Sequence, residues 1–277
     1  MSASEEASHE PSSGNRRAVV SGVVVDRATG PDGPAGTIVL LNSLGTTVGM
    51  WDSIVPLLAR SFDVVRFDQR GHGTATAHPA TAGLDDLAGD VLAVLDRLGV
   101  GRAHVAGVSI GGMIALRTAA LAPDRILSLA PMCCAAVYDG QSWIERAKTV
   151  REHGVEAIAP AVMDRWFTPE FRERRPEIVR SFADMLGSMD REGYAVGCDV
   201  LAEADVTGDL AHITAPTLVV GGAEDPAAPP DEQRAIARAV PHARLEILPA
   251  VAHIAPAAAP ELVAELVTAH ALNSSAV

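Results

Sequence analysis

Short runs of β-branched and other apolar residues alternate along this chain with longer stretches of helical periodicity. The runs are typical of strands, and the stretches between them are long enough for helices. This alternation is the pattern of βαβ units, which build a mostly parallel central sheet flanked by helices. Strands are predicted at Val19–Val25, Thr37–Leu41, Phe62–Phe67, Ala103–Val108, Ile126–Ala130, Thr217–Val220 and Arg244–Leu248.

The clearest helix is predicted over Leu84–Leu98, where leucine and valine recur on one face and two aspartates occupy the first turn. A glycine- and proline-rich turn is predicted over Gly30–Gly36. The strand alternation stops between Asp139 and Asp205, a charged segment of helical character, and resumes at Thr217. We therefore predict a disordered tail over residues 1–17, an α/β core over 18–138 and 206–277, and an inserted helical cap over 139–205.

Charge and composition exclude several classes of partner. The 277 residues include 22 Lys+Arg and 35 Asp+Glu, a formal net charge of −13. Phosphate-rich partners recruit dense lysine and arginine, so nucleic-acid and anionic-membrane binding are disfavoured. The N-terminal segment has no hydrophobic run and no apolar stretch approaches 20 residues, so we expect a cytoplasmic protein without a signal peptide. Its three cysteines lack metal-ligand spacing, so no metal site is expected.

The segment Gly107–Gly111 reads Gly-Val-Ser-Ile-Gly and lies between a predicted strand and a predicted helix. This is the G-x-S-x-G pattern, in which the serine occupies a strained turn and larger flanking residues would collide with the strand and helix. We predict that Ser109 is a nucleophile. The alternative is a buried glycine-rich turn that carries an idle serine.

A serine hydroxyl needs a general base, which in turn is oriented by an acid. For this turn the expected chain order is serine, carboxylate, histidine. Asp225 follows the strand predicted at Thr217–Val220; Glu224 is its rival, and we favour Asp225. His253 follows the last predicted strand, at the strand end where crevice residues gather. The predicted catalytic residues are Ser109, Asp225 and His253.

The negative charge that develops during acyl transfer requires two N–H donors. One is expected from Ile110, immediately after the nucleophile. The second is expected from Leu44, on the loop after the strand Thr37–Leu41. The alternative is that Leu44 is an ordinary loop leucine.

Five segments together resemble the α/β-hydrolase superfamily, from Val19 to Ala269, and at family level the 3-oxoadipate enol-lactonases of the β-ketoadipate pathway. The segments are Asn42–Gly45, Gly49–Asp52, Phe67–Gly73, Gly107–Met113 and Gly222–Pro226. The stretch from Trp143 to Trp166 is similar to the cap of that group. Two segments depart from it: Ala252–Pro256 lacks the usual Asn-x-Glu after the histidine, and Thr74–Thr81 is rich in alanine, threonine and histidine.

The resemblance implies an α/β-hydrolase fold and a serine hydrolase that opens a small anionic enol-lactone through an acyl-enzyme on Ser109, with no cofactor and no metal. Such a substrate carries a carboxylate. Because the protein has a net charge of −13, a positively charged side chain in the pocket is needed to bind it. Arg146 and Arg165 each lie near a tryptophan and are the candidates for it. Trp143 and Trp166 either pack the cap onto the core or wall the pocket.

Other functions of α/β-hydrolases are compatible with Ser109, Asp225 and His253. A general carboxylesterase and a cofactor-free haloperoxidase or perhydrolase would employ the same three side chains on small acyl groups. A non-catalytic small-molecule binding protein of the same fold is a further alternative. Haloalkane dehalogenases and epoxide hydrolases are disfavoured, because they need an aspartate where Ser109 stands.

Overall fold

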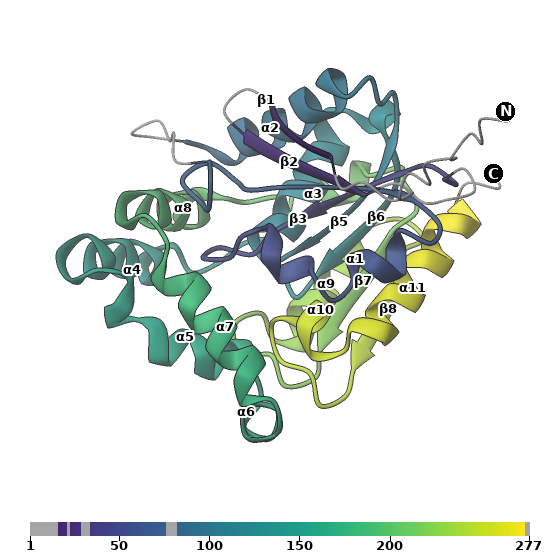
Figure 1. The fold of residues 1–277 in the computed structure, drawn as a ribbon. Coiled ribbons are helices and arrows are strands. Elements are labelled where there is room, and N and C mark those ends of the chain that lie inside the picture. Colours follow the sequence, from purple (N-terminus) through teal and green to yellow (C-terminus); the bar gives the residue numbers. More distant parts are fainter. Residues whose placement is uncertain (1–15, 21–22, 29–33, 76–81, 275–277) are drawn as a thin grey trace, which may run out of the picture.

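The computed structural model describes residues 16–20, 23–28, 34–75 and 82–274 (Figure 1). Within these residues eight strands form one sheet, in the order β1-β2-β4-β3-β5-β6-β7-β8. The six strands from β3 to β8 run parallel, and β1 and β2 extend the sheet in antiparallel orientation. The strands are β1 Arg16–Val20, β2 Val23–Ala28, β3 Thr37–Leu41, β4 Asp63–Phe67, β5 Ala103–Val108, β6 Ile126–Met132, β7 Leu218–Gly222 and β8 Arg244–Leu248.

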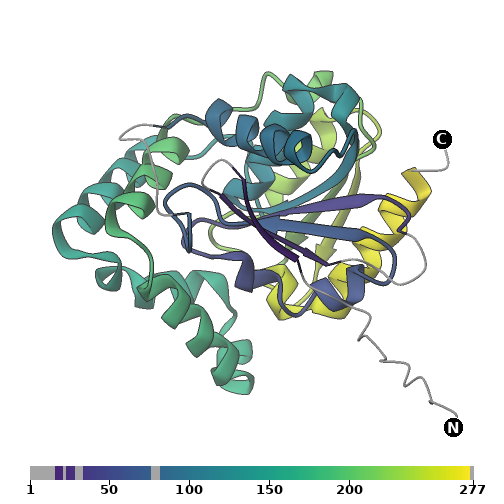
Figure 2. The ribbon, with the colours of Figure 1, turned by 45° about the horizontal axis from the view of Figure 1, so that its top comes forward.

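Helices cover both faces of the sheet. Figures 1 and 2 show α2, α3 and α9 on one face and α1, α10 and α11 on the other. These are α1 Val55–Leu58, α2 Leu84–Arg97, α3 Ile110–Leu121, α9 Pro230–Ala239, α10 Ala255–Ala258 and α11 Pro260–Ser274. Among the described helices none is long and apolar enough to cross a membrane.

Between β6 and β7 the chain forms a separate group of helices, drawn teal to green at the left of Figure 1. They are α4 Gly140–His153, α5 Ala159–Trp166, α6 Pro169–Arg174, α7 Pro176–Gly187 and α8 Arg191–Glu203. Short 3₁₀ turns lie here and in the core: η1 Val48–Trp51, η2 Pro123–Arg125, η3 Val155–Ala157 and η4 Leu210–His212. We call α4–α8 the cap helices. Their closest packing is between α4 and α8.

The mostly parallel sheet flanked by helices is confirmed, and β3, β5 and β8 have the predicted bounds. One strand prediction is wrong. The run Val19–Val25 is divided into two antiparallel strands, with Val20 opposite Val23, because the turn-favouring pair Ser-Gly interrupts the β-branched residues. Since β1 begins at Arg16, the predicted tail is also too long by two residues. The rest of that tail and most of the predicted turn at Gly30–Gly36 lie outside the described residues.

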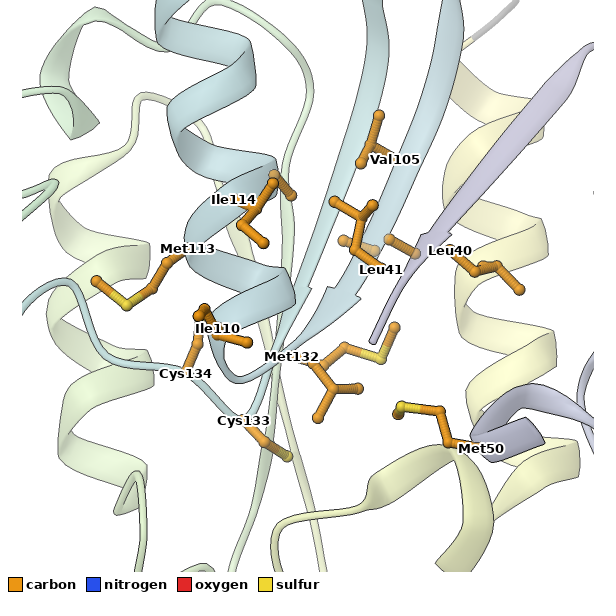
Figure 3. Packing of buried hydrophobic residues seen from close by; sticks show 14 of the residues in the cluster. Leu40, Leu41, Met50, Val105, Ile110, Met113, Ile114, Met132, Cys133 and Cys134 are labelled. Atoms are coloured by element: carbon orange, nitrogen blue, oxygen red, sulfur yellow. The ribbon is translucent and has the colours of Figure 1, made fainter. Parts of the chain in front are cut away.

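The central strands β3, β4 and β5 are buried along their whole length, as expected for parallel strands covered on both faces. Successive side chains of a strand point to opposite faces. In Figure 3, Leu41 accordingly lies toward Ile114 of α3, whereas Leu40 points toward the other layer. The helix α3, which carries the candidate nucleophile at its start, is thus embedded in the core.

A buried histidine makes stability depend on pH. His104 on β5 is 1% exposed, and a hydrogen bond of 2.8 Å joins its Nδ1 to Ser128 Oγ. Burial, helped by the nearby charges of His270 and Arg102, lowers the pKa of His104 to about 4 from an ordinary value of 6.5. Between these two pH values the unfolded chain binds more protons than the folded one. The free energy of unfolding therefore falls as the pH is lowered through this window.

We expect the wild type to lose roughly 2 to 3 kcal/mol more stability between pH 7 and pH 4.5 than His104→Gln, because glutamine cannot titrate. Urea unfolding of both proteins at the two pH values measures this difference. Equal losses would contradict the assignment of a depressed pKa to His104.

Candidate active site

Ser109 occupies a strained turn between β5 and α3. Its φ of 60° and ψ of −122° lie in a region that residues with a side chain rarely adopt. Close packing holds the turn. A Cβ on Gly107 would approach the carbonyl oxygen of Gly111 to 2.2 Å, and one on Gly111 would approach that of Leu41 to 2.3 Å. Glycine is therefore needed at both positions, because any side chain there would collide with neighbouring backbone. The turn places Ser109 at the carboxyl end of β5.

His253 and Asp225 form a buried pair. Asp225 lies on the loop after β7 and His253 on the loop after β8, and 2.8 Å separates Asp225 Oδ2 from His253 Nδ1. The other carboxylate oxygen of Asp225 accepts hydrogen bonds from the N–H groups of Ala227 and Ala228, at 2.8 and 3.1 Å. Glu224 is exposed and makes no such contact. Because a carboxylate only accepts hydrogen bonds, Nδ1 carries the proton and Nε2 is left as the basic nitrogen.

Ser109 and His253 line one cavity of about 500 Å³ at the carboxyl ends of the strands. The cap helices supply the opposite wall, with residues from α4, α5 and α8. The histidine loop is tied to the cap, since the N–H of Ile254 donates to the carbonyl of Trp166 at 3.2 Å. A nucleophile candidate and a base candidate therefore line the same cavity.

Leu44 also lines this cavity, on the loop Asn42–Thr46 that follows β3. Asn42 anchors the loop: its side chain donates to the carbonyl of Phe67 at 3.0 Å and accepts from the indole of Trp51 at 2.9 Å. Among the described residues the N–H of Leu44 has no acceptor. Ile110 is the first residue of α3, so its N–H has no acceptor within the helix. Two N–H groups are thus available near Ser109.

The two arginines that were candidates for meeting a carboxylate both line the cavity, Arg146 from α4 and Arg165 from α5. Neither has an ion-pair partner among the described residues. The guanidinium carbon of Arg146 lies 4.9 Å from the ring centre of Trp143. Arg165 remains exposed, but the partial loss of solvent around it lowers its pKa, and the positive charge of Arg146 adds to this effect. The cavity therefore holds two neighbouring positive charges without a counter-ion in the described part of the chain.

The two predicted tryptophans take part in both packing and the cavity wall. Trp143 is half-buried and meets the ring of Tyr138 edge-on at 5.8 Å. Trp166 is 5% exposed and meets the ring of Phe182 edge-on at 6.0 Å. Both line the cavity, so the choice between packing and pocket is not exclusive.

Sequence reasoning missed Tyr138. It lines the cavity, and its hydroxyl accepts a hydrogen bond from the N–H of Ala135 at 3.2 Å. Burial raises the pKa of Tyr138, against the opposing influence of that bond and of a hydrogen bond with Ser109. The phenol is therefore neutral and lies beside the nucleophile. No motif marks this position, because its proximity to Ser109 arises only when β5 and β6 pair.

Two thiols close to the acid cannot compete as nucleophiles. Cys133 and Cys134 are fully buried after β6. Burial, reinforced by the charge of Asp225, raises the pKa of Cys134 to about 12 and also raises that of Cys133. Both remain protonated at neutral pH, and neither is among the described residues that line the cavity with Ser109.

Comparison with known proteins identifies the family. Residues 36–259 match the family described as the alpha/beta hydrolase fold, which spans most of the chain. The chain belongs to the α/β-hydrolase family. It is 35% identical to 3-oxoadipate enol-lactonase 2 of Acinetobacter baylyi over 229 residues, which are 82% of this chain and 86% of that protein.

Solved structures agree with this hydrolase assignment. The enol-lactonase from Burkholderia xenovorans LB400 superposes with a TM-score of 0.87 at 35% identity, covering 92% of this chain and 99% of that one. A thermophilic esterase from Thermogutta terrifontis, solved with malate bound, superposes with a TM-score of 0.86 at 25% identity, covering 95% and 99%. The predicted fold class and family resemblance are confirmed, and the protein is a hydrolase of this fold.

Proposed function

We propose that this hydrolase opens a small carboxylate-bearing enol-lactone, converting 3-oxoadipate enol-lactone into 3-oxoadipate through an acyl-enzyme on Ser109. One observation carries the proposal: a single cavity is lined by Ser109, by the base of the His253–Asp225 pair and by two arginines without a counter-ion. The names of the relatives support the same reaction, since proteins 35% identical to this chain are enol-lactonases.

In the proposed reaction Ser109 Oγ attacks the ring carbonyl carbon while His253 Nε2 accepts its proton. Asp225 holds the other ring nitrogen and stabilises the imidazolium that forms. The carbonyl oxygen becomes an oxyanion, which the N–H groups of Leu44 and Ile110 stabilise.

The tetrahedral intermediate then breaks the ring C–O bond. The departing enolate oxygen takes the proton from His253, and the enol rearranges to a ketone. Water, deprotonated by His253, attacks the carbonyl carbon of the acyl-enzyme ester. The bond between this carbon and Ser109 Oγ then breaks, Oγ takes the proton back from His253, and the acyl group leaves as the second carboxylate. The proton transfers of Ser109, of the departing oxygen and of the attacking water pass through Nε2, which the bond to Asp225 leaves available.

The two arginines account for binding of the substrate carboxylate. A charge-assisted hydrogen bond from a guanidinium contributes about 1.5 to 3 kcal/mol. Arg146 is half-buried and held against Trp143, whereas Arg165 is exposed and better screened by solvent. We therefore assign the larger share of carboxylate binding to Arg146.

Replacing Arg146 by methionine should raise KM for the anionic lactone between about tenfold and 150-fold. Hydrolysis of the neutral ester p-nitrophenyl acetate should change little, because it presents no carboxylate. Arg165→Met should also raise KM for the anionic lactone and not for p-nitrophenyl acetate, but by a smaller factor. Arg174→Met is the matched control, since Arg174 is an exposed residue of α6 paired with Glu170. Equal losses on the charged and the neutral substrate would contradict the assignment.

A general carboxylesterase is the second candidate, favoured by the likeness to the Thermogutta terrifontis esterase. The same experiment tests the third candidate, that this chain binds a small molecule without catalysing a reaction. A fluorophosphonate probe should label Ser109 stoichiometrically, since labelling requires an activated hydroxyl. Peptide mass spectrometry locates the adduct. A chain that neither reacts with the probe nor hydrolyses p-nitrophenyl acetate would contradict every catalytic proposal made for it.

A further inference from the structure

The direction of the Leu44 N–H is set by the peptide unit that it shares with Ser43. The carbonyl oxygen of Ser43 accepts two hydrogen bonds from Thr46, one from its N–H at 3.1 Å and one from its hydroxyl at 2.8 Å. Because the peptide group is planar and trans, fixing this carbonyl also fixes the N–H of Leu44, which points the opposite way. Thr46 is fully buried, so these bonds do not compete with solvent.

The next peptide unit is fixed from a different part of the chain. The N–H of Gly45 donates to Nε2 of His72 at 3.0 Å, and His72 lies on the loop after β4. The other ring nitrogen, Nδ1, lies 3.1 Å from the carbonyl oxygen of Arg70. A carbonyl only accepts, so Nδ1 carries the proton and Nε2 is the acceptor. The neutral imidazole therefore connects two loops through its two nitrogens.

The cap helices leave these two loops little room to move. Gly71, with φ of +75°, packs backbone to backbone on Gly193 of α8, and a Cβ on Gly71 would lie 2.5 Å from the Cα of Gly193. A Cβ on Gly45 would lie within 2.8 Å of side chains of Leu186 and Tyr194. His72 is 2% exposed, and burial lowers its pKa, which maintains the neutral form.

We propose that His72 is a positioning residue of the reaction, which together with Thr46 directs the N–H of Leu44 at the developing oxyanion. His72 does not touch the reacting atoms; it acts through Gly45. This inference rests on the proposed function, because it needs an oxyanion at Leu44. The two peptide units flanking the Leu44 Cα are held by residues that the triad does not include.

The test compares His72→Leu with His72→Gln, using p-nitrophenyl acetate. Leucine removes the acceptor for the Gly45 N–H, whereas the glutamine amide oxygen reaches about the position of Nε2. A donor misplaced by an ångström costs about 100-fold in rate, and the loss falls on kcat because the oxyanion exists only in the transition state. We expect His72→Leu to lose about 100-fold in kcat with KM nearly unchanged, and His72→Gln to recover most of it.

Thr46→Val provides a second, independent variant, since it removes the hydroxyl bond to Ser43 and keeps the shape of the side chain. We expect about a tenfold loss in kcat, again without a change in KM. His212→Leu, at an exposed histidine of η4, is the matched control for His72→Leu. Thermal unfolding of each variant establishes that it is folded under the assay conditions.

The outcomes separate the two proposals. If the wild type hydrolyses no activated ester, the proposed function is contradicted. An active wild type overturns the role of His72 if folded His72→Leu keeps its kcat, if glutamine fails to recover the loss, or if KM changes instead of kcat. Should His72→Leu not fold, a kcat of Thr46→Val equal to that of the wild type overturns the inference.

Discussion

Ser109→Ala should lower kcat for ester and lactone hydrolysis by about 10⁴- to 10⁶-fold, since removal of the nucleophile of a serine triad has effects of this size. The variant should fold normally. Alanine meets the same backbone strain as serine at φ of 60°, and the packing of Gly107 and Gly111 around the turn is unchanged. The loss should therefore appear in kcat, with the melting temperature close to that of the wild type.

Ser142→Ala is the control for this experiment. Ser142 lines the same cavity from α4, but its hydroxyl donates to the carbonyl of Asp139 at 2.9 Å, so its proton is already engaged. Its activity should remain close to that of the wild type. Activity of Ser109→Ala within about tenfold of wild type would contradict the proposed nucleophile.

Asp225→Asn has the second largest expected effect, a loss of about 10⁴-fold in kcat. The N–H groups of Ala227 and Ala228 both donate to Oδ1, so the amide oxygen of asparagine would occupy that side. Its NH₂ group would then face Nδ1 of His253, where Oδ2 now lies. An NH₂ group donates, so the imidazole would carry its proton on Nε2 and could not accept one from Ser109.

Glu224→Gln tests whether the effect is specific to Asp225. The two carboxylates are adjacent in the chain, but Glu224 is exposed while Asp225 is 3% exposed and bonded to His253. Steady-state kinetics of both variants on one ester should show a loss for Asp225→Asn alone. A comparable loss for Glu224→Gln would mean that the acid has been misassigned.

Much of the site could be predicted because it follows from chain order. Ser109 comes directly after β5, and Asp225 and His253 lie on the loops that follow β7 and β8. Parallel strands bring their carboxyl ends to the same edge of the sheet. Their positions therefore followed from recognising strands, while their catalytic roles stay predictions. The same rule placed Leu44 after β3. Arg146 and Arg165 were proposed from their neighbouring tryptophans and from charge, and both line the cavity.

The remaining contacts depend on tertiary packing that no local pattern reveals. His72 was noticed only as part of a family segment, and its bond to Gly45 exists because β3 and β4 are neighbours in the sheet. Tyr138 reaches Ser109 only through the pairing of β5 and β6. The division of Val19–Val25 into two strands was missed for a local reason, because the β-branched residues on either side of Ser-Gly gave one continuous signal.

The most direct test of the proposed function is the rate at which the wild type consumes 3-oxoadipate enol-lactone, generated in situ, compared with simple alkyl esters. The lactone offers a good leaving group and a carboxylate for Arg146, so we expect its kcat/KM to exceed that of the esters by at least about tenfold. A kcat/KM no higher than that for simple alkyl esters would contradict the lactonase assignment and favour a general carboxylesterase.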